Sequence, residues 1–226
     1  MAGSLPQALA APTEDPFPNL SFREFSKFVD HNFSSRISLA TVLTILFTLT
    51  NNPDLLNLHS CQQNPHNDGE NAYVVTGWMK CLARALQERL SKDTSKLFNK
   101  SDKFESQTKE QIGHALSLKL DSFSKVLKLC SYDGQKRHVK NLQVISDHAI
   151  QPVITICPQA VECETYSCSG HSLVQSTRDC DLPHVTLIKG TKCYENVHVL
   201  SGKCSKCKTL YYADHESSVN VHTPTN

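Results

Sequence analysis

The chain has 226 residues, of which 39% are hydrophobic and 20% are charged, so most of it can fold around one large or two small cores. Its formal net charge is +1, and residues 151–226 contain six Lys and Arg against seven Asp and Glu. This balance excludes the strongly basic footprint of many nucleic-acid-binding domains.

The first sixteen residues predict a disordered leader. They lack a positively charged start and a sustained apolar stretch, so they do not resemble a secretion signal. The longest apolar run, residues 37–49, is too short to cross a bilayer. We therefore expect no membrane partner and an intracellular, reducing location, with the nucleus as one option.

Residues 17–150 predict a helical bundle. A capping box, Ser21 to Glu24, indicates the start of one helix, and Phe22, Phe25 and Phe33 recur at helical spacing as core residues. Residues 37–49 are apolar nearly all round, which favours a buried helix, although their β-branched residues leave a strand open. Another segment is expected to start at Pro53, and residues 61–69 predict a loop.

Two longer helices are predicted at residues 70–90 and 108–130, the second with a cap from Thr108 to Gln111. The densest basic cluster follows them and consists of Lys136, Arg137, His138 and Lys140. These side chains are candidates for phosphate contacts, and the alternative is a solvated helix end.

Two close cysteine pairs dominate the C-terminal part. Cys163 and Cys168 form the first pair, and Cys204 and Cys207 form the second, about three dozen residues later. Such spacing predicts a zinc ribbon, in which four thiolates bind one ion tetrahedrally. Disulfides and ordinary buried cysteines are the alternatives. A closed four-sulfur set has no open position for a water molecule, so the predicted zinc is structural.

The residues around these pairs predict a small sheet. Strands are expected at residues 184–188, 196–200 and 209–212, with Gly190 and Gly202 at turns. Cys157 and His171 are alternate ligands, and both could join Cys180 and Cys193 in a second site. Cys81 and Cys130 are predicted to be core residues.

No motif typical of an enzyme is present, and no small-molecule substrate is indicated. The second cysteine pair could instead be a thiol redox pair, although the residues after it favour a strand rather than the helix that such chemistry uses. Lys203, Lys206 and Lys208 flank this pair and are candidates for contact with an anionic partner.

Five cysteines carry a resemblance to a known family. Cys157, Cys163, Cys168, Cys204 and Cys207, in the segments 156–163, 168–170 and 203–212, resemble the CxC-type cysteine cluster associated with KDZ transposases. The resemblance extends over about residues 17–215. It implies a zinc-chelating domain that binds DNA or protein, and the absence of the transposase catalytic domain predicts a truncated or domesticated remnant without transposase activity.

These observations predict an α+β protein. Its expected parts are a leader at 1–16, a helical domain at 17–150, a cysteine-cluster zinc-ribbon domain at 151–216 and a flexible tail at 217–226. The expected function is a non-catalytic zinc-binding module, related to a KDZ-type transposase, that binds nucleic acid. The alternatives are a protein-interaction module with a structural zinc, whose partner would be a transposase-related protein, and a thiol redox enzyme.

Overall fold

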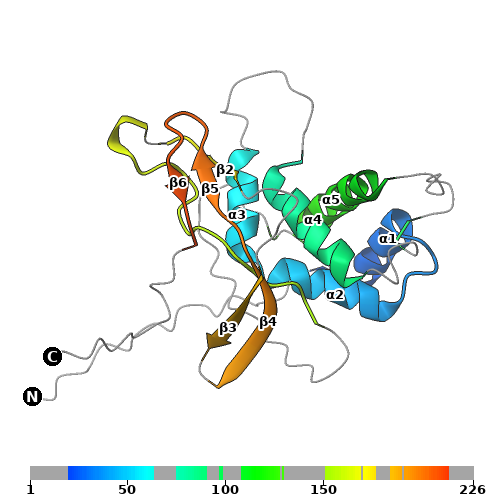
Figure 1. The fold of residues 1–226 in the computed structure, drawn as a ribbon. Helices are drawn as coiled ribbons and strands as arrows, with labels where there is room; N and C mark the ends of the chain where they lie inside the picture. The colour runs from blue at the N-terminus through cyan, green and yellow to red at the C-terminus, as the bar shows by residue number, and fades with distance from the viewer. Residues whose placement is uncertain are drawn as a thin grey trace, which may run out of the picture.

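The structure is a computed structural model that describes residues 20–63, 75–90, 97–98, 108–127, 129, 151–168, 170–176, 184–189 and 191–213. Within these ranges it contains five α-helices and two three-stranded sheets, so the predicted α+β class is confirmed (Figure 1). The expected leader, the expected tail and the basic cluster at 136–140 lie outside the described residues. None of the described helices combines the length and the apolar character needed to cross a bilayer.

Helix α1, Phe22–Asn32, begins with the predicted capping box, in which the backbone N–H of Glu24 donates to Ser21 and the Glu24 carboxylate accepts from Ser21. The predicted aromatic stripe is only partly correct. Phe22 is 83% exposed, because it lies at the free end of the stripe, whereas Phe33 is fully buried. Phe28 stacks on Phe123 with ring centroids 5.0 Å apart.

Helices α2, Leu39–Thr50, and α3, Pro53–Gln62, follow almost without a break. The strand alternative for residues 37–49 is wrong. The hydroxyl of Thr44 donates to a carbonyl one turn earlier, which lets a β-branched polar residue lie within a buried helix. Pro53 occupies the first turn of α3 as predicted, but Cys61, the first residue of the expected loop at 61–69, still belongs to the helix, and residues 64–69 lie outside the described residues.

Helices α4, Gly77–Arg89, and α5, Lys109–Val126, pack against each other. The helix expected from residue 70 starts at Gly77, since Thr76 is extended and caps it. The predicted capping box of Thr108 and Gln111 is present in α5, which ends four residues before the predicted end at residue 130. Trp78 and Phe123 are among the largest fully buried side chains of the core between the helices.

The two sheets lie in the C-terminal part. The first has the order β1-β4-β3, with β1 (Thr155–Ile156) parallel to β4 (Lys192–Val199) and β3 (His184–Lys189) antiparallel to it. The second has the order β2-β5-β6 and is antiparallel, with β2 (Leu173–Gln175), β5 (Gly202–Cys204) and β6 (Leu210–Tyr211).

Strands are present at most of the predicted positions. Gly202, which was predicted at a turn, instead belongs to a strand. Gly202 is the first residue of β5, where an added Cβ would lie 3.3 Å from the Leu173 side chain and 3.4 Å from the Trp78 ring, so the strand packs closely here. Gly190 lies outside the described residues.

The helices and the C-terminal part share one hydrophobic core. It extends from Phe33 and Phe123 in the helical part to Leu173 and Cys204 in the second sheet. The indole N–H of Trp78 donates to the carbonyl of Leu173 at 3.2 Å, which attaches β2 to α4.

Buried Asn52, between α2 and α3, makes a second connection to the C-terminal part. Its side-chain amide donates to the carbonyls of Thr48 and Val153, and its oxygen accepts from the backbone and hydroxyl of Thr155 at 2.7 Å. The backbone N–H of Val153 also donates to the Thr48 hydroxyl at 3.0 Å. One amide therefore satisfies backbone groups at the entry to β1.

We expect Asn52→Ala to lower the free energy of unfolding by about 2–4 kcal/mol, because it leaves the buried carbonyl of Val153 and the N–H of Thr155 without partners. Urea denaturation followed by circular dichroism measures this. Asn51→Ala is the matched control, since within the described part of the chain the Asn51 amide bonds to Phe47 in its own helix, and it should cost about 1 kcal/mol or less. Equal losses in both variants would contradict this role of Asn52.

Candidate metal centre

The first cysteine pair lies in a loop that folds back on itself before β2. The backbone N–H of Cys163 donates to the carbonyl of His171 at 2.8 Å, and Cys168 ends a short 3-10 helix, Tyr166–Cys168. Gly170 has φ +85°, a left-handed conformation that glycine adopts without strain, and it returns the chain toward β2. This local turn brings the two thiols to one side of the loop.

The second pair lies in the turn between β5 and β6. The N–H of Lys208 donates to the carbonyl of Cys204 at 3.1 Å, and the N–H of Cys204 donates to Thr209 at 3.0 Å. Lys208 has φ 65°, which is uncommon for a residue other than glycine. The tight turn presents Cys204 and Cys207 on one face.

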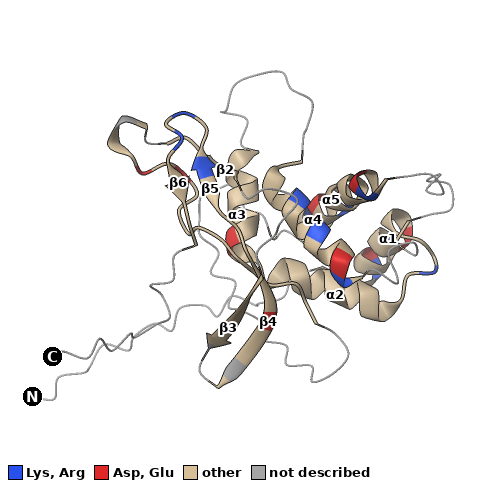
Figure 2. Ribbon diagram, in the orientation of Figure 1, with Lys and Arg blue, Asp and Glu red and all other residues tan. Residues whose placement is uncertain are grey.

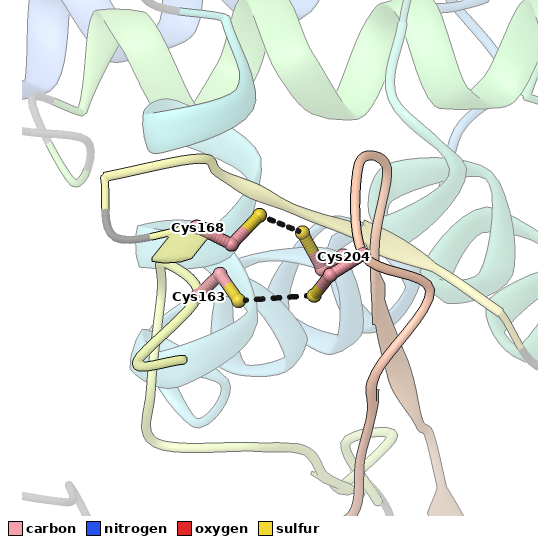
Figure 3. Close-up of side chains that lie close together, drawn as sticks. Cys163, Cys168 and Cys204 are labelled. Carbon is pink, nitrogen blue, oxygen red and sulfur yellow. Dashed lines mark hydrogen bonds between the residues drawn. The ribbon is translucent and has the colours of Figure 1, made fainter. Parts of the chain in front are cut away.

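All four sulfur atoms lie within 4.8 Å of one another (Figure 3). The Cys163 and Cys207 sulfurs are 3.5 Å apart, and the Cys168 and Cys204 sulfurs are 3.3 Å apart. Four sulfurs that each lie about 2.3 Å from one ion in a tetrahedron would be about 3.8 Å from one another. This separation lies between the 3.3 Å of the Cys168–Cys204 pair and the 4.8 Å limit of the group. The structure thus brings together the four cysteines selected from the sequence, and the group they form could hold a metal ion.

Hydrogen bonds set different protonation preferences within the group. Hydrogen bonds from Thr209 lower the pKa of Cys207 to about 5, and the Thr165 hydroxyl lowers the pKa of Cys163. Burial raises the pKa of Cys168 to about 12. Cys207 is therefore prepared as a thiolate, the Cys163 thiol is shifted in the same direction, and a bound cation would have to displace the proton of Cys168.

Tyr211 supports the group from β6, and the sequence did not single it out. Its hydroxyl donates to the Cys163 sulfur at 3.3 Å and accepts from the N–H of Glu164 at 2.8 Å. Such outer contacts orient a ligand and disperse its charge. The signal that could have identified it is strand alternation, which turns one of the two adjacent tyrosines toward the cysteines.

The alternate ligands lie elsewhere. Cys157 is buried in the shared core after β1, where burial raises its pKa. His171 contributes its backbone carbonyl to Cys163. Cys193 is exposed on β4, and Cys180 is outside the described residues. Among the residues that the structure describes, the four-cysteine group is the one set of three or more Cys, His, Asp or Glu close enough for a metal.

The basic candidates near the second pair are differently placed (Figure 2). Lys206 and Lys208 are exposed in the turn, whereas Lys203 is half-buried in β5 opposite Val174. Lys136, Arg137 and Lys140 lie outside the described residues. Because Cys204 and Cys207 flank a turn between strands, they lack the helix N-terminus that activates thiol redox pairs.

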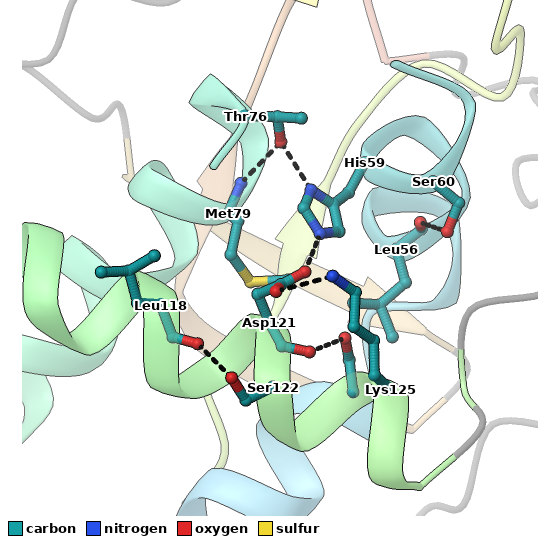
Figure 4. Close-up of polar contacts among 10 residues, drawn as sticks. Leu56, His59, Ser60, Thr76, Met79, Leu118, Asp121, Ser122 and Lys125 are labelled. Carbon is teal, nitrogen blue, oxygen red and sulfur yellow. Dashed lines mark hydrogen bonds and ion pairs between the residues drawn. The ribbon is translucent and has the colours of Figure 1, made fainter. Parts of the chain in front are cut away.

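A second polar cluster, which the sequence did not indicate, lies among the helices (Figure 4). The two ring nitrogens of His59 contact Thr76 at 2.7 Å and Asp121 at 2.8 Å, and Lys125 pairs with Asp121 at 3.0 Å. His59, Thr76 and Asp121 are buried, and the Thr76 hydroxyl also accepts from Met79 as the cap of α4. These contacts hold α3, the start of α4 and α5 together, so we assign the cluster a structural role.

Comparison with known proteins gives one result. Residues 151–224 match the family model CxC5, described as a CxC5 like cysteine cluster associated with KDZ transposases. The match includes all five cysteines on which the predicted resemblance rests. It begins at residue 151, after the helices, whereas the predicted resemblance also covered the helical part. No curated protein and no solved structure matches the chain.

In the metal-free protein, we expect Cys207 to be alkylated well before Cys168 at about pH 6.5, because Cys207 is already a thiolate at this pH and Cys168 is not. Mass spectrometry of partially iodoacetamide-treated protein measures the order. Thr209→Val should raise the Cys207 pKa and slow its alkylation about three- to tenfold, whereas Thr209→Ser keeps the hydroxyl and serves as the control. A Cys207 rate that still climbs steeply above pH 7 would contradict the low pKa.

Proposed function

We propose that this chain is a non-catalytic zinc-binding module associated with a KDZ-type transposase, and that it binds nucleic acid. The observation that carries the proposal is the convergence of four thiols within a segment that matches the CxC5 cysteine cluster. The transposase association comes from the description of that family model. A nuclear location would accompany this role.

Zinc is the metal that best suits the group. Four thiolates in a near-tetrahedral arrangement are typical of structural zinc, and every coordination position is then filled by sulfur. No position remains for an activated water molecule, which supports a role without catalysis. The sheet β2-β5-β6 with its two cysteine turns would then be a zinc ribbon placed on a helical bundle.

The surface around the cysteines supports nucleic-acid binding. Tyr166, between the first two cysteines, is 99% exposed, and Tyr212, after β6, is 69% exposed. Lys206 and Lys208, a few residues before Tyr212, are exposed as well. Aromatic faces that stack on bases, together with a few cations, are typical of single-strand binding. With so few cations, the affinity would depend on stacking more than on phosphate neutralisation.

A protein partner is the second candidate function. Strand β3 lies at the edge of its sheet, and Ile188 on this strand is 72% exposed. An edge strand with apolar side chains can accept a further strand from another chain. The near-neutral net charge is equally compatible with this candidate.

We expect the purified protein to contain about one zinc ion per chain and Cys204→Ser to lose it, because a structural site needs its four ligands. Cys157→Ser should retain the metal, since Cys157 lies outside the group. Elemental analysis measures the content. Trp78, the single tryptophan, contacts β2 and Gly202, so its fluorescence should change when a chelator removes the ion.

Cys193→Ser, an exposed position on β4, is the control for general effects of cysteine removal. A Cys204→Ser variant with unchanged zinc, or zinc lost equally from Cys157→Ser and Cys204→Ser, would contradict the assignment of the four ligands.

For nucleic acid, we expect Tyr166→Ala and Tyr212→Ala each to weaken binding to a single-stranded oligonucleotide by about 5- to 150-fold, the equivalent of about 1–3 kcal/mol of stacking. Fluorescence anisotropy at low and moderate salt measures this, with duplex DNA compared in parallel. Phe22→Ala, an exposed aromatic on α1, is the matched control and should bind as the unchanged protein does.

If zinc-loaded protein binds neither single strands nor duplex at low salt, the nucleic-acid role is wrong and the protein partner is the better candidate. If all three aromatic variants bind equally well, the surface around the cysteines is not the binding face.

A further inference from the structure

The close sulfur contacts of the metal centre run between its two turns. Cys163 and Cys168 lie in the loop before β2, whereas Cys204 and Cys207 lie at the turn between β5 and β6. The Cys163 sulfur lies 3.5 Å from that of Cys207, and the Cys168 sulfur lies 3.3 Å from that of Cys204 (Figure 3). Each contact therefore joins one cysteine of the first turn to one of the second.

These cross-turn pairs are close to the geometry of a disulfide. All four cysteines are free thiols, and a disulfide places its two sulfurs about 2.0 Å apart. The gap that each pair must close is therefore about 1.3–1.5 Å. A modest rotation about the Cα–Cβ bond moves a cysteine sulfur this far while the backbone stays in place.

Backbone hydrogen bonds hold the two turns beside each other. Cys204 lies opposite Leu173 in the β2–β5 ladder, and the N–H of Cys163 donates to His171 at 2.8 Å. The N–H of Lys208 donates to Cys204 at 3.1 Å. These bonds do not involve the sulfurs, so the contacts between the turns do not depend on a metal alone.

The two cross-turn pairs differ in their access to solvent. Cys207 is the most exposed member of the group, whereas Cys168 is 3% and Cys204 is 0% exposed. A dissolved oxidant therefore reaches Cys207 first, and Cys163 from the other turn is in contact with it. The buried pair is left in contact with itself.

We propose that the metal centre is redox-sensitive, and that a peroxide converts it to two cross-turn disulfides, Cys163–Cys207 and Cys168–Cys204, with release of the ion. This proposal rests on the zinc site proposed above. It adds a regulation of that site, because the same four sulfurs then exist in a metal-bound and a disulfide form.

The reaction balances with one peroxide for each disulfide. The Cys207 thiolate attacks one peroxide oxygen, the O–O bond breaks, and a sulfenic acid and hydroxide form. The Cys163 thiolate then attacks the Cys207 sulfur and displaces a second hydroxide as the S–S bond forms. The two sulfurs lose two electrons and the peroxide gains them. A second peroxide oxidises Cys168 and Cys204 in the same way, and the cation, left without thiolate ligands, leaves the site.

Cross-turn pairing has a structural consequence that pairing within each turn lacks. A bond between the turns replaces the ion as the closure between segments 36 and 44 residues apart in the sequence. The sheet β2-β5-β6 therefore keeps its shape after the ion has left. A dithiol reductant reverses both bonds and restores the four thiols.

The test treats the zinc-loaded full chain with hydrogen peroxide, blocks the remaining thiols with N-ethylmaleimide, and maps the disulfides by mass spectrometry. Trypsin cuts after Lys206, between Cys204 and Cys207, and Glu-C protease cuts after Glu164, between Cys163 and Cys168. The digest thus separates the three ways of pairing four cysteines. Cys193→Ser is the background, because this exposed cysteine can link two chains.

We expect linked peptides for Cys163–Cys207 and Cys168–Cys204, zinc release that rises with disulfide formation, and recovery of zinc binding after dithiothreitol. The fluorescence of Trp78, which contacts β2, should stay near its zinc-loaded value in the oxidised protein and change in the reduced, chelated protein. Cys157→Ser, at a buried position outside the group, is the matched control and should leave the pairing unchanged.

Disulfides within the turns, Cys163–Cys168 and Cys204–Cys207, would overturn the proposal. So would zinc that leaves with sulfinic acids and no disulfide, zinc that peroxide does not release, or a pairing that changes in Cys157→Ser. Each of these outcomes leaves the zinc content measured before oxidation intact. A chain that holds no zinc from the start would contradict the proposed function instead, and the pairing is then read from the metal-free chain.

Discussion

The convergence of four sulfur atoms is the interaction on which the C-terminal part of the structure depends. Strands β2, β5 and β6 are two or three residues long, and a sheet of this size buries too little apolar surface to be stable alone. The two cysteine turns come from segments about forty residues apart, so an ion between them would close a long loop and hold both sheet edges. Tyr211 adds a hydrogen bond to this closure.

The second sheet is also supported from the helical side. Trp78 contacts Leu173 and the backbone at Gly202, and the same core continues to Phe123. Asn52 performs the equivalent task for the first sheet by satisfying the backbone before β1. The small sheets therefore rest on a larger apolar base, which lowers the stability that a bound ion would have to supply.

Local signals in the sequence predicted local structure well. The capping boxes at Ser21 and Thr108, the proline at the start of α3 and the strand at 184–188 all depend on neighbouring residues, and all are present. The four cysteines were selected from their spacing, since short pairs can meet only by turning back on themselves.

Features that depend on distant contacts were not predictable. Periodicity placed Phe22 and Phe33 on one stripe, but only the packing decides which end of the stripe is buried. The partners of Asn52 and His59 lie far along the chain, and no local pattern indicates them. Gly202 was assigned to a turn from composition, whereas the structure places it in β5, packed against the side chains of Leu173 and Trp78. Cys157 matched the family pattern, yet its place in the core depends on the helices.

The backbone at Lys208 limits what this position can become. Its left-handed φ of 65° comes directly after the two cysteines of the second turn and directs the chain back toward Thr209 and β6. Glycine or asparagine would fit there at least as easily as lysine, whereas valine or isoleucine would clash with their own main chain. A single nucleotide change that introduced a branched residue would thus disturb the turn between β5 and β6 without replacing any of the four cysteines.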